Sequence, residues 1–169
     1  PGRQRAPRMA SSERREQILA CALAQTAERG LAHARHSDVA ASAEVAVPTV
    51  FHYFKTRADL AAAVLGEVER LLFQDIVEPC FAATATAPEA LTAILLAFAD
   101  AIDSHPDHIR IWLAWSTAVR GEYWEAYLGF HQRAMRYVMD KIEQGKREGS
   151  LRAALDTEDF VVVAKFHFS

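Results

Sequence analysis

The segment Val47–Leu60 decides the fold prediction, and it reads VPTVFHYFKTRADL. Between Pro48 and Lys55 it holds two phenylalanines, a tyrosine and a histidine, and a helix-starting pattern follows at Thr56. A helix of about two turns is too short to form alone in water, because its first turn is costly to nucleate. We therefore expect tertiary contacts to hold this segment in place.

One side of the short helix is apolar. At about 100° per residue, Val50 and Phe54 share a face, and Phe51 lies beside them. We expect these three side chains to anchor the segment. Their predicted partners are apolar residues of the preceding and following helices: Leu19, Leu23, Val39, Ala40 and Leu60.

The other side carries Thr49, His52 and Tyr53, and Lys55 and Arg57 follow shortly after. Short polar side chains beside cations are typical of a recognition helix, in which polar groups contact base edges in the DNA major groove and cations contact phosphates. The alternative is that the HYF triplet is an aromatic part of the core. The pattern alone leaves both interpretations open.

The surrounding sequence predicts helices and no strand. Glycine and proline are scarce, at 7 and 6 residues, and apolar residues recur every three or four positions, as they do on the inner face of a helix. A first helix is predicted to begin at Ser11 or Ser12 and to stop at Gly30. Two short helices are expected at residues 37–43 and 47–54.

A long helix is predicted next, because Thr56 and Asp59 have the spacing of a capping box. Its inner apolar stripe reaches Val77, and Pro79 is expected to end it. The fold class is therefore predicted to be all-α. The remaining predicted elements are a linker at 82–87, helices at 88–104, 107–120 and 122–147, and a helix from Thr157 that the chain leaves unfinished.

The charge is divided unevenly along the chain. The net charge is only −3, but residues 1–58 carry nine Lys/Arg and five Asp/Glu, a net +4, whereas residues 59–169 carry ten and seventeen, a net −7. A basic first part and an acidic second part suit one module that contacts phosphate and another that does not. We therefore predict two domains, residues 1–58 and 59–169.

The composition is that of a folded protein outside membranes, with 51% hydrophobic and 24% charged residues. The most apolar window, at 90–102, is interrupted by Thr92 and Asp100, so no membrane span is predicted. Cys21 and Cys80 lie in apolar helical patterns without metal-like spacing. Free thiols in the cytoplasm are the favoured interpretation over a disulfide.

From Gly30 to Leu65 the chain resembles the N-terminal helix-turn-helix module of TetR-type transcriptional regulators, with DVAASAEVAVPTVFHYFKTRADLAAAVL at the centre of the match. The later segment HIRIWLAWSTAVRGEYW and the long helix after it are similar to the LuxR/HapR-type quorum-sensing master regulators of vibrios. The resemblance implies a three-helix DNA-binding module joined by a long helix to a larger C-terminal helical bundle. It also implies a homodimer on a (pseudo)palindromic DNA operator. We predict no cofactor and no metal site.

The resemblance further implies which residues meet DNA. Positions matching Thr49, His52 and Tyr53 face the bases, Lys55 and the helix start at Thr56 meet phosphates, and Ser37 opens the first helix of the pair. The complete predicted set in the module is Ser37, Val47, Pro48, Thr49, His52, Tyr53, Lys55 and Thr56.

Three positions depart from the family pattern. His52 stands where the vibrio-type regulators have Asn, so the preferred DNA sequence is expected to differ. Glu44 stands where the family favours Gly in the turn, and we expect it to adopt a helical or bridge conformation. Ala46 replaces a Ser or Thr cap, which leaves Pro48 to help set the start of the short helix.

Arginines precede the module, and we predict that Arg3, Arg5 and Arg8 form a minor-groove arm. Flexible arginines bind the negative potential of narrow minor grooves, and the resembling regulators have such an arm. The alternative is that residues 1–8 are a cloning remnant.

The resemblance assigns dimerisation and effector binding to the C-terminal part. The helix at 122–147 and the one from Thr157 would form the dimer surface, and the chain is expected to stop short of the family's usual final helix. The predicted interface residues are Tyr127, Arg136, Phe160 and Ala164. A pocket for a small apolar ligand is predicted among Phe98, Ile109, Trp112, Leu113, Trp115, Phe130, His131, Met135 and Met139. The same residues equally suit a plain core.

Two other functions compete with this prediction. His105 and His108, with Asp103 and Asp107, suggest a metal-sensing protein, although Pro106 separates them. A helical interaction protein that keeps the fold without binding DNA is the second alternative. An enzyme is not predicted, because the sequence has no phosphate-binding glycine loop, nucleophile elbow or H-E-x-x-H motif.

Overall fold

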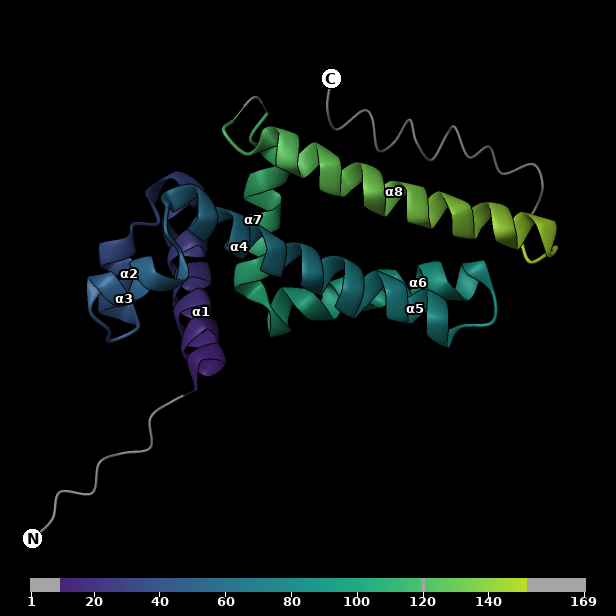
Figure 1. Cartoon of the computed structure of the whole chain (residues 1–169). Helices are drawn as coiled ribbons and strands as arrows, with labels where there is room; N and C mark the ends of the chain where they lie inside the picture. The colour runs from purple at the N-terminus through teal and green to yellow at the C-terminus, as the bar shows by residue number, and fades with distance from the viewer. Residues whose placement is uncertain (1–9, 120, 152–169) are drawn as a thin grey trace, which may run out of the picture. The chain divides into compact units, whose positions relative to one another are not determined.

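The computed structural model describes residues 10–119 and 121–151, whose regular elements are all helices, with no strand among them (Figure 1). The predicted all-α class is therefore confirmed. The chain divides into two compact units, Pro1–Glu67 and Val68–Ser169. The division between the units falls near the end of the helix at Arg57–Glu69, whereas the boundary predicted after residue 58 lies at the start of the same helix. In the described part, none of the helices combines the length and the apolar character that a bilayer span requires.

The N-terminal unit is built from four α-helices and one short 3₁₀ turn. The helices α2 and α3 lie side by side, and α2 packs on α1 (Figure 1). Its buried apolar residues include Ile18, Ala22 and Leu23 of α1, Val39 and Ala40 of α2, and Val50 of α3. The elements are α1 (Ser11–Arg29), η1 (Leu31–His33), α2 (His36–Ser42), α3 (Val47–Tyr53) and α4 (Arg57–Glu69).

The helix α1 begins at Ser11, as predicted, although neither serine caps it. Ala10, rather than Ser11 or Ser12, is the capping residue, and its N–H donates to Glu13 Oε2 at 3.0 Å. The helix stops before Gly30, as expected, where the glycine takes a φ of 85°. The carboxylate of Glu13 therefore satisfies the N–H of the capping residue, whereas Ala10 has no side-chain oxygen to accept from the first-turn N–H groups.

The turn between α2 and α3 closes α2 with a complete Schellman motif. The N–H of Val45 donates to Ala40 O at 3.0 Å and the N–H of Glu44 donates to Ala41 O at 3.3 Å. Glu44 takes a φ of 53°. The expected helical or bridge conformation at Glu44 is wrong, because the motif requires a left-handed residue at this position whatever its side chain.

The helix α4 begins with the predicted capping box. The N–H of Thr56 donates to Asp59 Oδ2 at 2.9 Å, and the N–H of Asp59 donates to Thr56 Oγ1 at 3.0 Å. At its far end the chain stays helical through η2 (Arg70–Val77), a π-helical segment, and α5 (Glu78–Ala83).

The prediction that Pro79 ends the helix is therefore wrong, because α5 continues past it. A proline inside an α-helix clashes with the carbonyl four residues earlier. Here the wider π-helical turn precedes it, in which the N–H of Glu78 donates to the carbonyl of Phe73, five residues earlier. We attribute the tolerance of Pro79 to this wider turn, in which the four-residue hydrogen-bond register is already broken.

In the C-terminal unit, α6 (Ala87–Ser104) contacts η2, α5, α7 (Pro106–Thr117) and α8 (Trp124–Arg147). A capping box of Thr86 and Glu89 opens α6, and His105 separates it from α7. These boundaries match the predicted helices, except that α7 ends at Thr117 rather than near residue 120.

The helix α8 is the longest described element, and it too ends in a Schellman motif. Gly149 takes a φ of 76°, its N–H donates to Lys146 O at 3.2 Å, and the N–H of Ser150 donates to Gly145 O at 3.0 Å. The predicted helix from Thr157 lies outside the described residues.

Candidate nucleic-acid interface

The helix α3 is held by its apolar side. Val50 and Phe54 are buried, as predicted. Phe51 was predicted to join them, but its side chain is 46% exposed. Its ring stacks on the imidazole of His36, with centroids 4.2 Å apart and an interplanar angle of 8°. Phe51 therefore covers His36 from the solvent side instead of entering the core.

His36 is the residue of this site that the sequence analysis missed. It is only 5% exposed, and its Nε2 lies 2.8 Å from the carbonyl oxygen of Phe54, the residue that ends α3. A helix-terminal carbonyl has no partner within its own helix, so this contact satisfies it from α2. The spacing of His36 to the buried Val39, Ala40 and Ala43 could have placed it on the inner face of α2.

The opposite side of α3 is open to solvent. Val47, Pro48 and His52 are exposed, and Thr49 and Tyr53 are half-buried. The Tyr53 hydroxyl lies 3.2 Å from the hydroxyl of Ser11 in the first turn of α1, and its ring meets the His52 ring edge to face at 5.0 Å. None of the predicted base-contacting side chains is therefore sealed in the core. We refer below to the exposed residues Val47, Pro48, Phe51, His52 and Lys55 as the α3 face.

The start of α3 lacks a side-chain cap, as expected. Ala46 is the capping residue, no side chain bonds to the first turn, and Pro48 occupies the second helical position. A proline there loses no hydrogen bond, because first-turn N–H groups have no partner within the helix. Lys55 and Thr56 follow α3 and are both exposed.

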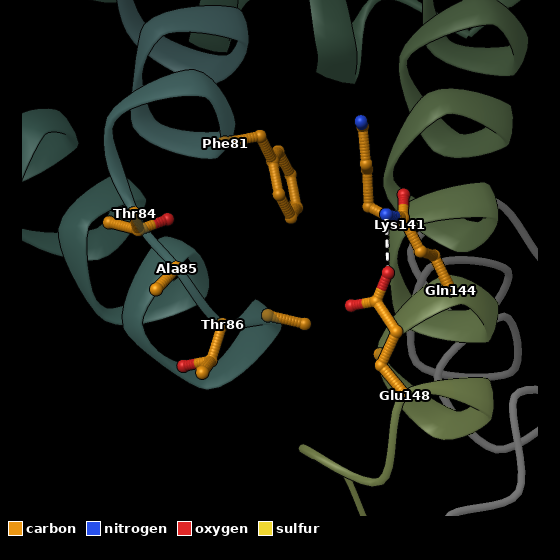
Figure 2. Close-up of a pocket in the computed structure, with 9 residues that line it drawn as sticks. Phe81, Thr84, Ala85, Thr86, Lys141, Gln144 and Glu148 are labelled. Atoms are coloured by element: carbon orange, nitrogen blue, oxygen red, sulfur yellow. Dashed lines mark hydrogen bonds between the residues drawn. The ribbon is translucent and has the colours of Figure 1, made fainter.

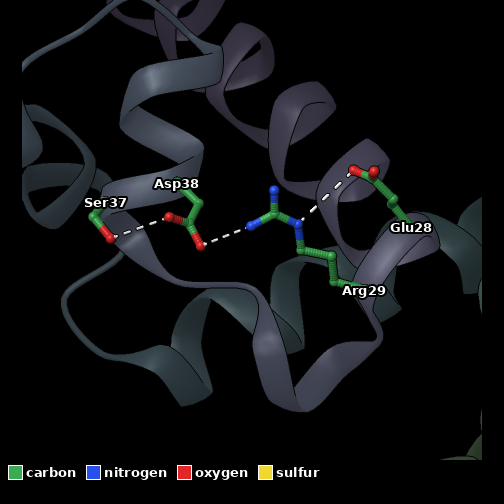
Figure 3. A network of polar contacts seen from close by, with 4 residues as sticks. All are labelled: Glu28, Arg29, Ser37 and Asp38. Carbon is green, nitrogen blue, oxygen red and sulfur yellow. Dashed lines mark hydrogen bonds and ion pairs between the residues drawn. The ribbon is translucent and has the colours of Figure 1, made fainter.

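The start of α2 presents Ser37 on the surface, beside a chain of polar contacts that reaches α1 (Figure 3). The Ser37 hydroxyl donates to Asp38 Oδ1 at 3.5 Å, and Arg29 Nη1 donates to Asp38 Oδ2 at 3.3 Å. Arg29 also pairs with Glu28 at 3.9 Å. Ser37 is the second residue of α2 rather than its cap, which is Arg35. These exposed contacts link the first turn of α2 to the end of α1.

The predicted arm residues Arg3, Arg5 and Arg8 lie outside the described residues. So do Phe160 and Ala164 of the predicted dimer surface. Of the other two interface residues, Arg136 is exposed, whereas Tyr127 is only 3% exposed within one chain. Placing Tyr127 on a dimer surface is therefore wrong, because its ring packs among other aromatic rings of the C-terminal unit.

An apolar cavity of about 480 Å³ lies within the C-terminal unit. Five of the predicted pocket residues line it: Phe98, Trp112, Phe130, His131 and Met135. The π-helical segment η2 contributes residues that the sequence analysis did not place there. The further lining residues are Leu72, Phe73, Val77, Leu91, Ile94, Leu95, Ala134 and Val138.

Four predicted pocket residues do not line the cavity. Ile109 and Trp115 are buried in the core, and Leu113 is exposed. Met139 is half-buried and is not among the lining residues. Trp115 is held there because its Nε1 donates to Tyr123 O at 2.9 Å and its ring stacks on Phe130 at 6.0 Å.

A smaller polar hollow of about 70 Å³ lies between the start of α6 and the end of α8 (Figure 2). Thr84, Thr86, Lys141 and Glu148 line it, and Gln144 Nε2 donates to Glu148 Oε1 at 2.7 Å. This volume suits one or a few water molecules. It is too small for an organic effector.

The metal-site alternative gains no support in the described part of the chain. His105 and His108 meet edge to face at 5.6 Å, but His105 Nδ1 lies 2.9 Å from the Ser104 hydroxyl. No group of three His, Cys, Asp or Glu side chains able to hold a metal ion occurs among the residues that the structure describes.

A short helix with an open polar side, fixed across a four-residue turn to a partner helix, defines a helix-turn-helix module of the kind found in DNA-binding regulators. Residues 18–64 match the family model of bacterial regulatory proteins of the tetR family. This match, together with the relatives below, shows that the module of residues 18–64 is similar to the N-terminal module of TetR-family regulators.

Two curated relatives are regulators. The chain is 31% identical over 121 residues to the HTH-type transcriptional regulator LuxR of Vibrio harveyi, covering 72% of this chain and 58% of LuxR. It is 26% identical over 151 residues to the HTH-type transcriptional repressor KstR2 of Mycobacterium tuberculosis, covering 87% of this chain and 74% of KstR2. The chain thus spans less than two thirds of the length of LuxR.

Solved structures confirm the fold. The ketosteroid transcriptional regulator KstR2 of Mycobacterium tuberculosis superposes with a TM-score of 0.68 at 24% identity, over 97% of this chain and 81% of that protein. A TetR-like transcriptional regulator from Rhodococcus sp. RHA1 has a TM-score of 0.66 at 21% identity, over 84% and 76% of the two chains.

Proposed function

We propose that the protein is a sequence-specific DNA-binding transcriptional regulator and that the α3 face contacts the major groove. The observation that carries this proposal is the two-sided construction of α3. Buried Val50 and Phe54 and the His36 contact hold one side, while His52 and Lys55 remain exposed on the other. A rigidly held helix with an open polar side is what base reading requires.

The α3 face offers three kinds of DNA contact. His52 donates to a purine N7 or accepts from an exocyclic amine, depending on its tautomer. The exposed ring of Phe51 suits the methyl group of thymine, which apolar side chains contact in the major groove. Lys55 supplies a cation for a phosphate, and the net +4 of residues 1–58 favours approach to DNA.

The protein acts as a homodimer on a (pseudo)palindromic operator under this proposal. A single helix of seven residues, Val47–Tyr53, covers only a few base pairs. Two copies reading half-sites about 34 Å apart, or a multiple of that spacing, supply the specificity that one copy lacks. The similar proteins LuxR and KstR2 are both named as transcriptional regulators, which supports a regulatory role.

We further propose that a small ligand controls DNA binding, in line with the predicted quorum-sensing type of regulator. The 480 Å³ cavity falls within the usual size of ligand sites, about 300–1,000 Å³. The two α3 helices of a dimer must match the spacing of the two half-sites. A ligand that binds more tightly to a dimer conformation without this spacing would weaken operator binding by population shift. Three lining residues belong to η2, which continues directly from α4.

The proposal is tested by selecting bound sequences from random DNA and titrating the recovered duplex in a mobility-shift assay at several salt concentrations. We expect one enriched, two-fold symmetric motif. The affinity should fall with salt on a log–log slope of about −0.9 per phosphate neutralised. Recovery of no motif, with salt-independent retention, would refute DNA binding.

A further inference from the structure

The chemistry of the cavity in the C-terminal unit limits what it can hold. Among the described residues that line it, the only polar side-chain groups are the imidazole of His131 and the indole N–H of Trp112. No Lys, Arg, Asp or Glu belongs to this described lining. A charged ligand group inside the cavity would lose its hydration and gain no ionic partner from these residues, which is strongly unfavourable.

His131 is held in a defined position on the wall. It is half-buried, and its ring stacks on Tyr127, with centroids 5.7 Å apart and an interplanar angle of 21°. Burial lowers the pKa of His131 below its usual value, so the imidazole is neutral near pH 7. A neutral imidazole offers one donor and one acceptor and no charge.

The cavity opens beside α6. Leu95 lines it and yet is 72% exposed, so this side chain stands at the boundary between the cavity and the solvent. The next residue, Leu96, is 67% exposed and does not line the cavity. A ligand therefore has a route past Leu95, and Leu96 provides a neighbouring position of similar exposure for comparison.

We propose that this cavity binds a neutral, largely apolar molecule carrying one hydroxyl or carbonyl group that pairs with His131. The inference deepens the proposed function, on which its regulatory meaning rests, by naming the class of the effector and the residue that selects it. The apolar walls bind the body of the molecule without selecting its orientation, whereas His131 fixes the single polar group.

The first experiment measures binding of N-phenyl-1-naphthylamine, a neutral fluorophore made of a naphthyl and a phenyl group, to the full chain at pH 7.5. Leu95→Trp narrows the opening and should weaken binding severalfold or more, whereas Leu96→Trp should bind as the unaltered chain does. Both positions are exposed, so neither substitution is expected to prevent folding. Failure of the unaltered chain to bind the fluorophore, or equal binding by both variants, would overturn the inference.

The second experiment displaces the fluorophore with three molecules that share one ring system: 1-naphthol, 1-methylnaphthalene and 1-naphthoate. We expect 1-naphthol to compete best and 1-naphthoate to need roughly tenfold or higher concentrations than 1-naphthol. His131→Leu should remove the advantage of 1-naphthol over 1-methylnaphthalene while fluorophore binding persists. Equal or stronger competition by 1-naphthoate, or an unchanged advantage of 1-naphthol in His131→Leu, would contradict the assignment.

These measurements need no DNA, so they separate the two proposals. A chain that shows the expected order of competitors but selects no DNA sequence would retain the cavity assignment and refute the regulatory function. A chain that selects a DNA motif but binds the fluorophore equally well in both leucine variants would refute the cavity assignment alone.

Discussion

The imidazole Nε2 of His36 lies 2.8 Å from the carbonyl oxygen of Phe54. This contact joins the first residue of α2 to the residue that ends α3, and both groups are buried. The helix α3 is thus held at its C-terminal end by a side chain of α2. Because α3 has no side-chain cap at its start, this contact at its end contributes more to holding the helix in position.

His36→Leu should lower the free energy of unfolding by about 1–3 kcal/mol, because the buried carbonyl of Phe54 loses its partner. Chemical denaturation followed by circular dichroism measures this change. His33→Leu is the matched control, since His33 is exposed on η1. Equal stability of the two variants would show that the His36 contact contributes nothing.

Glu44→Gly should raise the free energy of unfolding by about 1 kcal/mol. Glu44 takes a φ of 53°, and this left-handed conformation is unfavourable by about 1–2 kcal/mol for residues with a Cβ atom. Glycine removes this strain, but its greater freedom in the unfolded chain offsets part of the gain. Glu44→Ala keeps the Cβ atom and should not produce the gain. A stabilisation of the same size in Glu44→Ala would point to the charge instead of the backbone.

Gly145→Ala should destabilise the C-terminal unit. A Cβ atom at Gly145 would lie 2.8 Å from Ala87 Cβ and 3.1 Å from Leu151 Cδ1. Overpacking of about 1–3 kcal/mol outweighs the gain of about 0.5–1 kcal/mol that alanine brings to a helix. Gly129→Ala, in the same helix, meets only Arg133 Nη1 at 3.5 Å and should be neutral or stabilising in thermal unfolding. A stabilising Gly145→Ala would show that α6 and α8 do not approach so closely.

The stability of the C-terminal unit should depend on pH through His131. Burial lowers its pKa in the folded state, so the unfolded state binds more protons as pH falls through the ordinary imidazole value of about 6.5. The contribution of neutral His131 to the free energy of unfolding is therefore fully present above that pH and is lost as the pH falls below it. His131→Gln should flatten the slope of unfolding free energy against pH between about 7 and 5. An unchanged slope in the variant would assign the pH dependence to other groups.

The elements that could be predicted from the sequence are those set by local patterns. The Thr56–Asp59 capping box, the start of α6 and the anchoring of α3 by Val50 and Phe54 all rest on residues close together in the chain. Neither the buried position of His36 nor the exposure of Phe51 was predicted. The spacing of His36 within α2 could have indicated its burial, but its stacking on Phe51 joins two helices, and spacing within one helix does not predict such a contact.

The remaining differences have similar causes. The left-handed Glu44 follows from the backbone bonds that close α2, which override the preference of its side chain. Continuation of the helix past Pro79 follows from the π-helical segment before it, which has no marker in the sequence. The aromatic and methionine residues indicated where a cavity could lie. Sequence could not tell which of them line it, because only the packing distinguishes a lining residue such as Trp112 from a core residue such as Trp115.

The affinity of His52→Ala for the selected DNA motif tests most directly whether the α3 face reads DNA. Relative to the unaltered chain, we predict a loss of about 1–3 kcal/mol on that motif, little change on unrelated duplex, and relaxed preference at one base position. Lys55→Ala should instead weaken both duplexes alike, and His33→Ala should change neither. Equal affinities of His52→Ala and the unaltered chain for the motif, with the same base preferences, would contradict the account.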